Sequence, residues 1–221
     1  MPTKFPLERT EFLLEGPIGL VECISDCPEA DVSLPVTAVL CHPHPLHGGT
    51  MHNKVVTIMD RALREVGVHT VRMNFRGAGA SEGSHDDGFG ETDDLMMVVD
   101  WVRRVRPDDE ILLGGFSFGS YVCLRASGKL SLNQLILIAP PVERYEFSEL
   151  KAPKCPWIVI QGDEDDVVPA EAVISWAREI EPTPRLDVME QAGHFFHRRL
   201  MDLRGLIKNG VRDQLPGKPA A

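Results

Sequence analysis

The feature that most constrains the fold of this chain is a regular alternation of short apolar runs with amphipathic segments. Runs rich in valine, isoleucine and leucine predict about eight strands, over residues 11–14, 18–24, 37–41, 68–75, 111–115, 135–139, 157–161 and 185–189. Helical spacing of apolar residues predicts helices over residues 53–66, 92–105, 117–127, 169–180 and 196–208. This order predicts an α/β fold with a mainly parallel sheet covered by helices on both faces. The first two strands have no helix between them, so we expect them to pair antiparallel at one edge.

The length of the chain fits one domain. A chain of 221 residues, 43% of them hydrophobic, can bury a sizeable core. We expect a single domain over residues 1–210 and a frayed tail over residues 211–221. The connection over residues 140–156 is too short to form a cap domain, so any site at the end of the sheet should be open.

The charge of the chain argues against several classes of partner. The chain has 33 acidic and 23 basic residues and a net charge of −10, which disfavours binding to nucleic acid and to anionic membranes. No apolar run approaches the roughly 20 residues of a membrane span, and the start has no signal-peptide core. We therefore expect a soluble, cytoplasmic protein. Its five scattered cysteines contain no CxxC pair and predict reduced thiols.

The pentapeptide Gly115-Phe-Ser-Phe-Gly119 lies between a predicted strand and a predicted helix. A serine at such a turn is held in a strained backbone conformation, and the flanking glycines keep other side chains away from it. The hydroxyl of Ser117 is then exposed above the end of the sheet. The position predicts a nucleophile.

A serine nucleophile needs a base and a carboxylate that orients the base, and the chain supplies both in the expected order. Asp165 follows the strand predicted over residues 157–161, and His194 follows the next strand. Asp166 is an alternative to Asp165, and His197 is an alternative to His194. We prefer Asp165 for its place after Gly162, and His194 because His197 would point along the following helix.

The reaction also needs two donors for a developing oxyanion. The amide of Phe118, next after the nucleophile, is the first candidate. The second should come from the loop over residues 42–49, where Pro43 and Pro45 have no N–H. His44 is therefore the preferred donor, with Leu46 as the second choice.

Two other chemistries can be weighed on the same residues. His42, His44 and His47 are spaced like zinc ligands, but Leu46 stands where an aspartate should be and no second ligand cluster follows. The glycine-rich segment over residues 76–83 has the wrong spacing for a dinucleotide loop. We expect neither a metal nor another cofactor.

Several motifs together resemble the α/β-hydrolase superfamily, and in particular a small lidless bacterial branch related to the dienelactone hydrolases. The motifs occupy residues 42–51, 53–56, 74–81 and 115–119, and the resemblance runs from about residue 12 to 206. It implies Ser117 as nucleophile, Asp165 as orienting acid, His194 as base and no cofactor. Dienelactone hydrolases have a cysteine where this chain has Ser117, so their substrate cannot be carried over.

The sequence thus predicts a serine hydrolase that cleaves small carboxylic esters or thioesters through an acyl-enzyme, acting as a monomer or homodimer. The substrate pocket is expected to be lined by apolar and aromatic side chains: Leu46, Met51, Phe118, Tyr145, Phe147 and Phe195. The alternatives are a metal-dependent hydrolase that uses the histidine loop, and a binding module that keeps the hydrolase fold without turnover.

Overall fold

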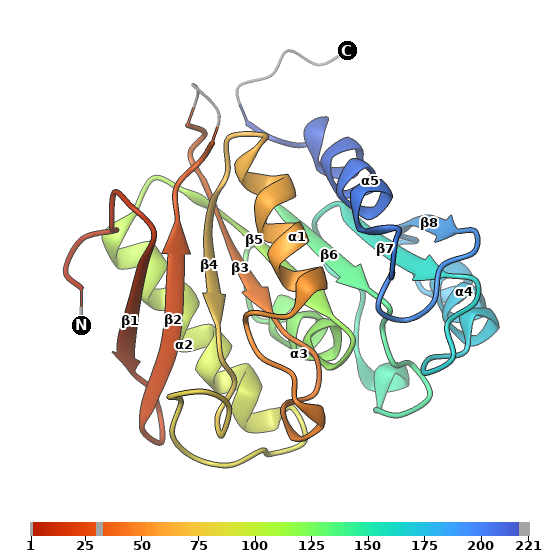
Figure 1. Ribbon diagram of the computed structural model, residues 1–221, viewed down its shortest axis with the longest axis horizontal. Helices are drawn as coiled ribbons and strands as arrows, with labels where there is room; N and C mark the ends of the chain where they lie inside the picture. The colour runs from red at the N-terminus through yellow and green to blue at the C-terminus, as the bar shows by residue number, and fades with distance from the viewer. Residues whose placement is uncertain (1, 30–32, 217–221) are drawn as a thin grey trace.

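The computed structural model describes residues 2–29 and 33–216, which form a sheet between two layers of helices (Figure 1). The sheet has eight strands in these residues, in the order β1-β2-β4-β3-β5-β6-β7-β8. Only the β1–β2 and β2–β4 pairs are antiparallel. The strands are β1 (Thr10–Glu15), β2 (Leu20–Asp26), β3 (Val36–Cys41), β4 (His69–Met73), β5 (Glu110–Phe116), β6 (Gln134–Ile138), β7 (Trp157–Gly162) and β8 (Arg185–Met189). The predicted mainly parallel sheet, with an antiparallel edge, is confirmed.

Within the described part of the chain, five α-helices cover the two faces of the sheet. They are α1 (Lys54–Arg64), α2 (Phe89–Val105), α3 (Phe118–Ser127), α4 (Ala170–Glu179) and α5 (Leu200–Arg212). Helices α1 and α5 pack together on one face, and α2, α3 and α4 cover the other (Figure 1). The central strands β3, β5, β6 and β7 are apolar on both faces because each face meets a helical layer.

Helix α2 begins earlier than its apolar spacing predicts. Its first residue is Phe89, and Gly88 rather than Thr92 is the N-cap. The Glu91 carboxylate accepts the amide hydrogen of the N-cap, Gly88, and that of Asp86 in the preceding loop, so it fixes the start of the helix. Part of the segment over residues 84–90, expected to be loop, is therefore helical.

Helix α5 is displaced toward the C-terminus relative to its prediction. It begins at Leu200 rather than at residue 196 and continues to Arg212. Val211 is fully buried and Leu215 is 3% exposed, because both pack in the core beneath α1 and α5. The expected tail is thus wrong for residues 211–216, while residues 217–221 lie outside the described part of the chain.

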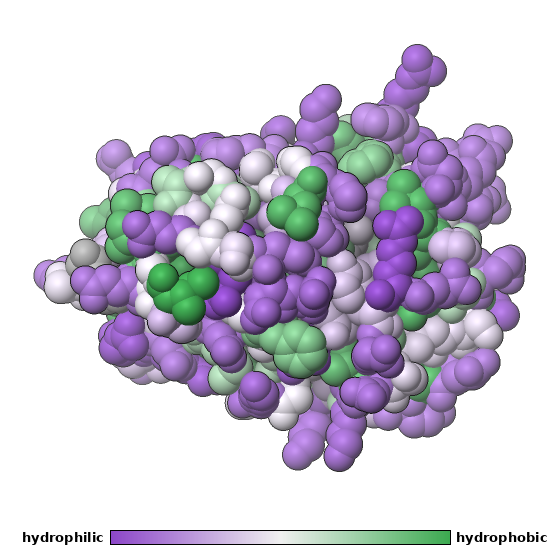
Figure 2. Space-filling view, turned by 90° about the horizontal axis from the view of Figure 1, so that it is seen from below, coloured by the Kyte–Doolittle hydropathy of each residue, from purple (hydrophilic) through white to green (hydrophobic). Residues whose placement is uncertain are grey.

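The carboxyl ends of the parallel strands form one open edge of the molecule. In the described residues, the segment between β6 and β7 contains a single 3₁₀ turn, η2 (Phe147–Glu149), and no further domain. Figure 2 views the molecule from this edge, where hydrophilic and hydrophobic side chains are interspersed over the surface. None of the helices in the described ranges combines the length and the hydropathy of a membrane span.

Candidate active site

Ser117 lies at the sharp turn between β5 and α3. Its φ of 53° and ψ of −120° are values that a residue with a side chain rarely adopts, at a cost of about 1–3 kcal/mol. The Ser117 amide donates to the Ile138 carbonyl of β6 at 2.8 Å, which ties the turn to the neighbouring strand. The predicted strand, turn and helix therefore follow one another as the pentapeptide requires.

Both glycines of the pentapeptide are needed for close backbone approach. A Cβ on Gly115 would collide with the Gly119 carbonyl oxygen of the first helical turn. A Cβ on Gly119 would lie 2.5 Å from the Cys41 carbonyl oxygen and 2.7 Å from that of His42. Helix α3 therefore starts in backbone contact with the loop that follows β3, and this contact brings that loop beside Ser117.

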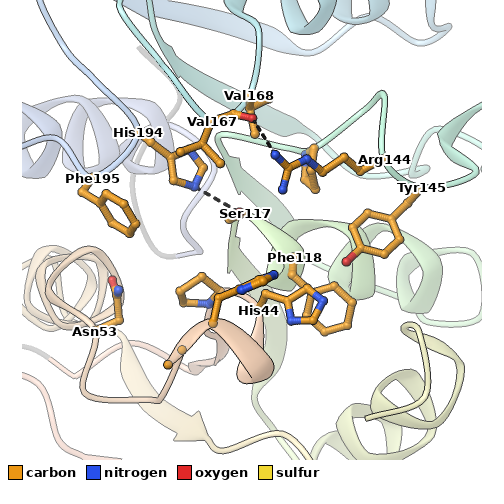
Figure 3. A pocket seen from close by; sticks show the side chains of 15 residues that line it. His44, Asn53, Ser117, Phe118, Arg144, Tyr145, Val167, Val168, His194 and Phe195 are labelled. Atoms are coloured by element: carbon orange, nitrogen blue, oxygen red, sulfur yellow. Dashed lines mark hydrogen bonds between the residues drawn. The ribbon is translucent and has the colours of Figure 1, made fainter.

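The structure brings Ser117, His194 and Asp165 together in one chain of hydrogen bonds, of which Figure 3 shows the bond between Ser117 and His194. His194 Nε2 lies 3.1 Å from Ser117 Oγ, and His194 Nδ1 lies 2.8 Å from Asp165 Oδ2. The imidazole of His194 is 3% exposed, and its ring packs against Phe116 and Phe195. A carboxylate on Nδ1 leaves Nε2 as the acceptor for the serine proton.

Asp165 is held by hydrogen bonds to both of its carboxylate oxygens. Oδ1 accepts the amide hydrogens of Val167 at 2.9 Å and Val168 at 2.7 Å. Burial alone would raise the pKa of this carboxyl, but the hydrogen bonds from His194, Val168 and Val167 hold the pKa below its usual value. Of the two candidate acids, Asp165 is therefore the one in contact with His194.

The two alternative residues lie away from this chain of hydrogen bonds. Asp166 is exposed. His197 is exposed as well. It is expected to lie on the last helix, but α5 begins after it, at Leu200.

Gln161 is a residue of the site that the sequence reasoning missed. It is the buried penultimate residue of β7, and its Nε2 donates to Asp165 Oδ2 at 3.1 Å and to the Gly162 carbonyl at 3.1 Å. The available signal was a polar amide at the end of an otherwise apolar strand. Buried polar side chains need partners, and here the partner is Asp165.

The two proposed oxyanion donors, Phe118 and His44, lie on the same side of Ser117 (Figure 3). Phe118 is the first residue of α3, so its amide is one of the donors that a helix start leaves free. His44 is the N-cap of η1 (Pro45–His47), and its Nδ1 accepts the Leu46 amide at 3.2 Å. That bond occupies the amide of Leu46, the second-choice donor.

His42 cannot share a cation with His44 and His47 because both of its ring nitrogens are engaged. Nε2 accepts the Phe75 amide at 2.9 Å, and Nδ1 donates to the Pro43 carbonyl at 2.6 Å. Burial lowers the pKa of His42 to about 4, which keeps the ring neutral. Within residues 2–29 and 33–216, no group of three His, Cys, Asp or Glu side chains could hold a metal ion.

The site opens into a pocket of about 430 Å³. Three of the predicted lining residues, Phe118, Tyr145 and Phe195, line it. The prediction is wrong for Leu46, which is 71% exposed and does not line the pocket, and for Met51 and Phe147, which are buried in the core. The other lining residues are Pro43, His44, His47, Gly48, Gly49, Asn53, Ser117, Pro141, Arg144, Val167, Val168 and His194.

The fold and the site together have the architecture of a serine hydrolase. Comparison with known proteins identifies the family of the chain. Residues 37–214 match the alpha/beta hydrolase domain family, and the chain belongs to that family. It is similar to an α/β serine hydrolase without a lid from Xanthomonas campestris, with 51% identity, 98% of this chain and 99% of that chain covered, and a TM-score of 0.95. It also resembles an α/β serine hydrolase homologue from Coxiella burnetii, with 44% identity, coverage of 93% and 99%, and a TM-score of 0.90.

Esterases are more distant structural neighbours. Est1E from Butyrivibrio proteoclasticus, solved with bound ferulic acid, shares the fold at 17% identity, with coverage of 88% and 95% and a TM-score of 0.78. The resemblance to the α/β-hydrolase superfamily and its lidless members is thereby confirmed. The narrower relation to dienelactone hydrolases stays a prediction.

Proposed function

We propose that this protein is a serine hydrolase that cleaves small carboxylic esters or thioesters through an acyl-enzyme. The observation that carries the proposal is the unbroken chain of hydrogen bonds from Ser117 Oγ through His194 to Asp165. Each member has the partner that nucleophilic catalysis requires: a base on the serine and an orienting carboxylate on the base.

In the proposed first step, Ser117 Oγ attacks the acyl carbon while His194 Nε2 takes the serine proton. Asp165 fixes the histidine tautomer and stabilises the imidazolium, because its Oδ2 accepts the Nδ1 hydrogen. His194 then gives the proton to the leaving oxygen or sulfur, and the acyl group stays on Ser117. Water repeats the sequence, with His194 as base, and releases the acid.

The amides of Phe118 and His44 are proposed to bind the oxyanion of each tetrahedral intermediate. Gly119 supports this assignment, since its lack of a Cβ lets the start of α3 touch the loop that carries His44. Such donors act best when they are fixed before the reaction, and removing one costs on the order of 10²–10³ in kcat. His44 contributes its backbone here, while burial lowers the pKa of its ring to about 4 and keeps it neutral.

A fluorophosphonate probe and 4-nitrophenyl acetate test the proposal on the same preparations. Wild type should be labelled and should release nitrophenol, and Ser117→Ala should do neither. Ser148→Ala is a matched control because Ser148 is exposed and outside the pocket lining. Equal labelling and equal turnover of wild type and Ser117→Ala would refute the proposal.

The two alternatives give different results in these assays. A metal-dependent hydrolase would lose turnover in EDTA and keep it in Ser117→Ala. A binding module would bind esters without turnover in a substrate panel. We favour the serine hydrolase because neither alternative has a need for all three members of the hydrogen-bonded chain.

A further inference from the structure

The side chains that line the pocket differ in charge from the chain as a whole. The chain carries a net charge of −10, yet none of the described residues that line the pocket is acidic. Arg144 is the one permanently charged side chain among them. Arg144 is exposed, so it can reach an anionic ligand in the pocket, and its attraction for that ligand is screened by solvent and salt.

Arg144 has no acidic partner in the structure as described. Its Nη2 donates to the Val167 carbonyl at 3.3 Å, and no carboxylate of residues 2–29 or 33–216 lies within 4.0 Å of the guanidinium. Figure 3 shows the side chain reaching from the loop after β6 toward Val167 and Ser117. A guanidinium has five N–H donors, so Arg144 has donors left over for a carboxylate on a ligand.

The wall beside Arg144 consists of packed aromatic rings. Tyr145 stacks on Tyr121 with ring centroids 4.6 Å apart and packs against Phe118 at 5.4 Å. Burial raises the pKa of Tyr145 to about 12, so its hydroxyl stays neutral. This wall suits a short methylene chain between the reacting carbonyl and an anionic group.

The stereochemistry of the proposed reaction decides which part of the substrate meets Arg144. In the tetrahedral intermediate, the leaving group must lie near His194, which protonates it, and the oxyanion must face Phe118 and His44. The acyl chain takes the remaining direction. Figure 3 shows His194 and Phe195 on one side of Ser117 and Arg144 with Tyr145 on the other, so the acyl chain extends toward Arg144.

We propose that the substrate is an ester or thioester whose acyl chain ends in a carboxylate, and that Arg144 binds this carboxylate. The substrate is then a half-ester or half-thioester of a short dicarboxylic acid. This inference rests on the proposed serine hydrolase function and adds the substrate class and the residue that selects it.

Two pairs of esters test the inference. The first pair, mono-(4-nitrophenyl) adipate and 4-nitrophenyl hexanoate, differs by a charge on the acyl chain. The second pair, 4-acetoxybenzoate and its methyl ester, differs by a charge on the leaving group. The readout is the ratio of kcat/KM between charged and neutral members of each pair, corrected for uncatalysed hydrolysis.

We expect Arg144→Gln to lower the adipate-to-hexanoate ratio at least about tenfold, and Arg144→Glu to lower it further through like-charge repulsion. Arg144→Lys should keep part of the preference. Arg178→Gln is the matched control, because it removes one positive charge from an exposed site on α4 outside the pocket and should leave the ratio unchanged. Added salt should weaken the wild-type preference, since the Debye length falls to about 3 Å at 1 M.

An adipate-to-hexanoate ratio that is the same in wild type and Arg144→Gln would overturn the inference while leaving the hydrolase proposal intact. A loss of preference confined to the 4-acetoxybenzoate pair would also overturn it, because the charge would then bind on the leaving-group side. If wild type hydrolyses none of the four esters and is not labelled by the fluorophosphonate, both the proposed serine hydrolase function and this inference are refuted.

Discussion

The substitution Asp165→Asn changes one atom of the site and should nearly abolish turnover. The carboxylate faces donors on both sides: Oδ1 accepts two backbone N–H groups, from Val167 and Val168, and Oδ2 accepts the side-chain donors His194 Nδ1 and Gln161 Nε2. An asparagine side chain has one accepting oxygen and one donating NH₂ group, so it can match only one of these two sides.

The backbone donors determine which way that amide points. The Val167 and Val168 amides are fixed by the loop, at 2.9 and 2.7 Å, and cannot become acceptors. The asparagine oxygen must therefore take the Oδ1 position, and its NH₂ group then faces His194 Nδ1. His194 can accept that hydrogen bond only as the tautomer with its proton on Nε2, which cannot take the proton of Ser117.

A reversed tautomer leaves the geometry intact and lowers kcat about 10⁴-fold in triads of this kind. At about 1.4 kcal/mol per factor of ten, that is about 5 kcal/mol of lost transition-state stabilisation. The assay is kcat for 4-nitrophenyl acetate, with circular dichroism and the thermal midpoint as checks on folding. Asp166→Asn is the matched control, because Asp166 is the adjacent, exposed alternative.

The result has a clear refutation. A folded Asp165→Asn protein that loses less than about 30-fold in kcat would mean that Asp165 does not set the tautomer of His194. An equal loss in Asp166→Asn would mean that the negative charge of the loop matters and the specific hydrogen bond does not.

Three further predictions concern stability. Gly119→Ala places a Cβ against two backbone carbonyls, so it should lower the unfolding free energy by about 1–3 kcal/mol and also lower activity. Gly205→Ala places a Cβ in open space on α5 and should raise the unfolding free energy by about 0.5–1 kcal/mol, as measured by denaturant titration. Ser117→Gly should be about 1 kcal/mol more stable than Ser117→Ala, because glycine tolerates the positive φ; equal thermal midpoints would contradict the strain argument. The pKa of His42 is about 6.5 in the unfolded chain and about 4 in the folded protein, so between these values only the unfolded state binds a proton. As pH falls through this range, wild type should therefore lose about 3 kcal/mol of unfolding free energy from His42, and His42→Gln should lose less. Parallel pH profiles of unfolding free energy would refute this.

The fold could be predicted from sequence because its signals are local. Strands such as β7 are continuous apolar runs, which only a sheet covered on both faces can bury. The start of α2 could not be predicted from apolar spacing, because the Glu91 carboxylate that caps Gly88 lies within the helix and its effect is a matter of side-chain geometry. Leu215 extends the core beyond α5 for a similar reason, since its burial depends on tertiary contacts.

The pocket was the least predictable part of the molecule. Apolar character near the motifs predicts lining residues, but Met51 and Phe147 are buried in the core and Leu46 is exposed outside the pocket. The direction of a loop side chain depends on backbone angles that composition does not determine. Arg144, which carries the charge of the pocket, lies in a connecting segment with no motif at all.

Motifs that are far apart in the sequence hold the same loop. The residues just beyond β4 fix both ends of the segment over residues 42–51: the Phe75 amide donates to His42 Nε2 at 2.9 Å, and Asn74 Oδ1 accepts the Met51 amide at 2.8 Å. The segment between these anchors carries His44 and contacts the start of α3 through Gly119. The motifs near residues 42, 74 and 117 therefore each hold part of one backbone arrangement, which we propose lets the His44 amide reach the oxygen of a substrate bound at Ser117. A substitution at Asn74 should accordingly disturb the reaction through His44, although Asn74 does not line the pocket.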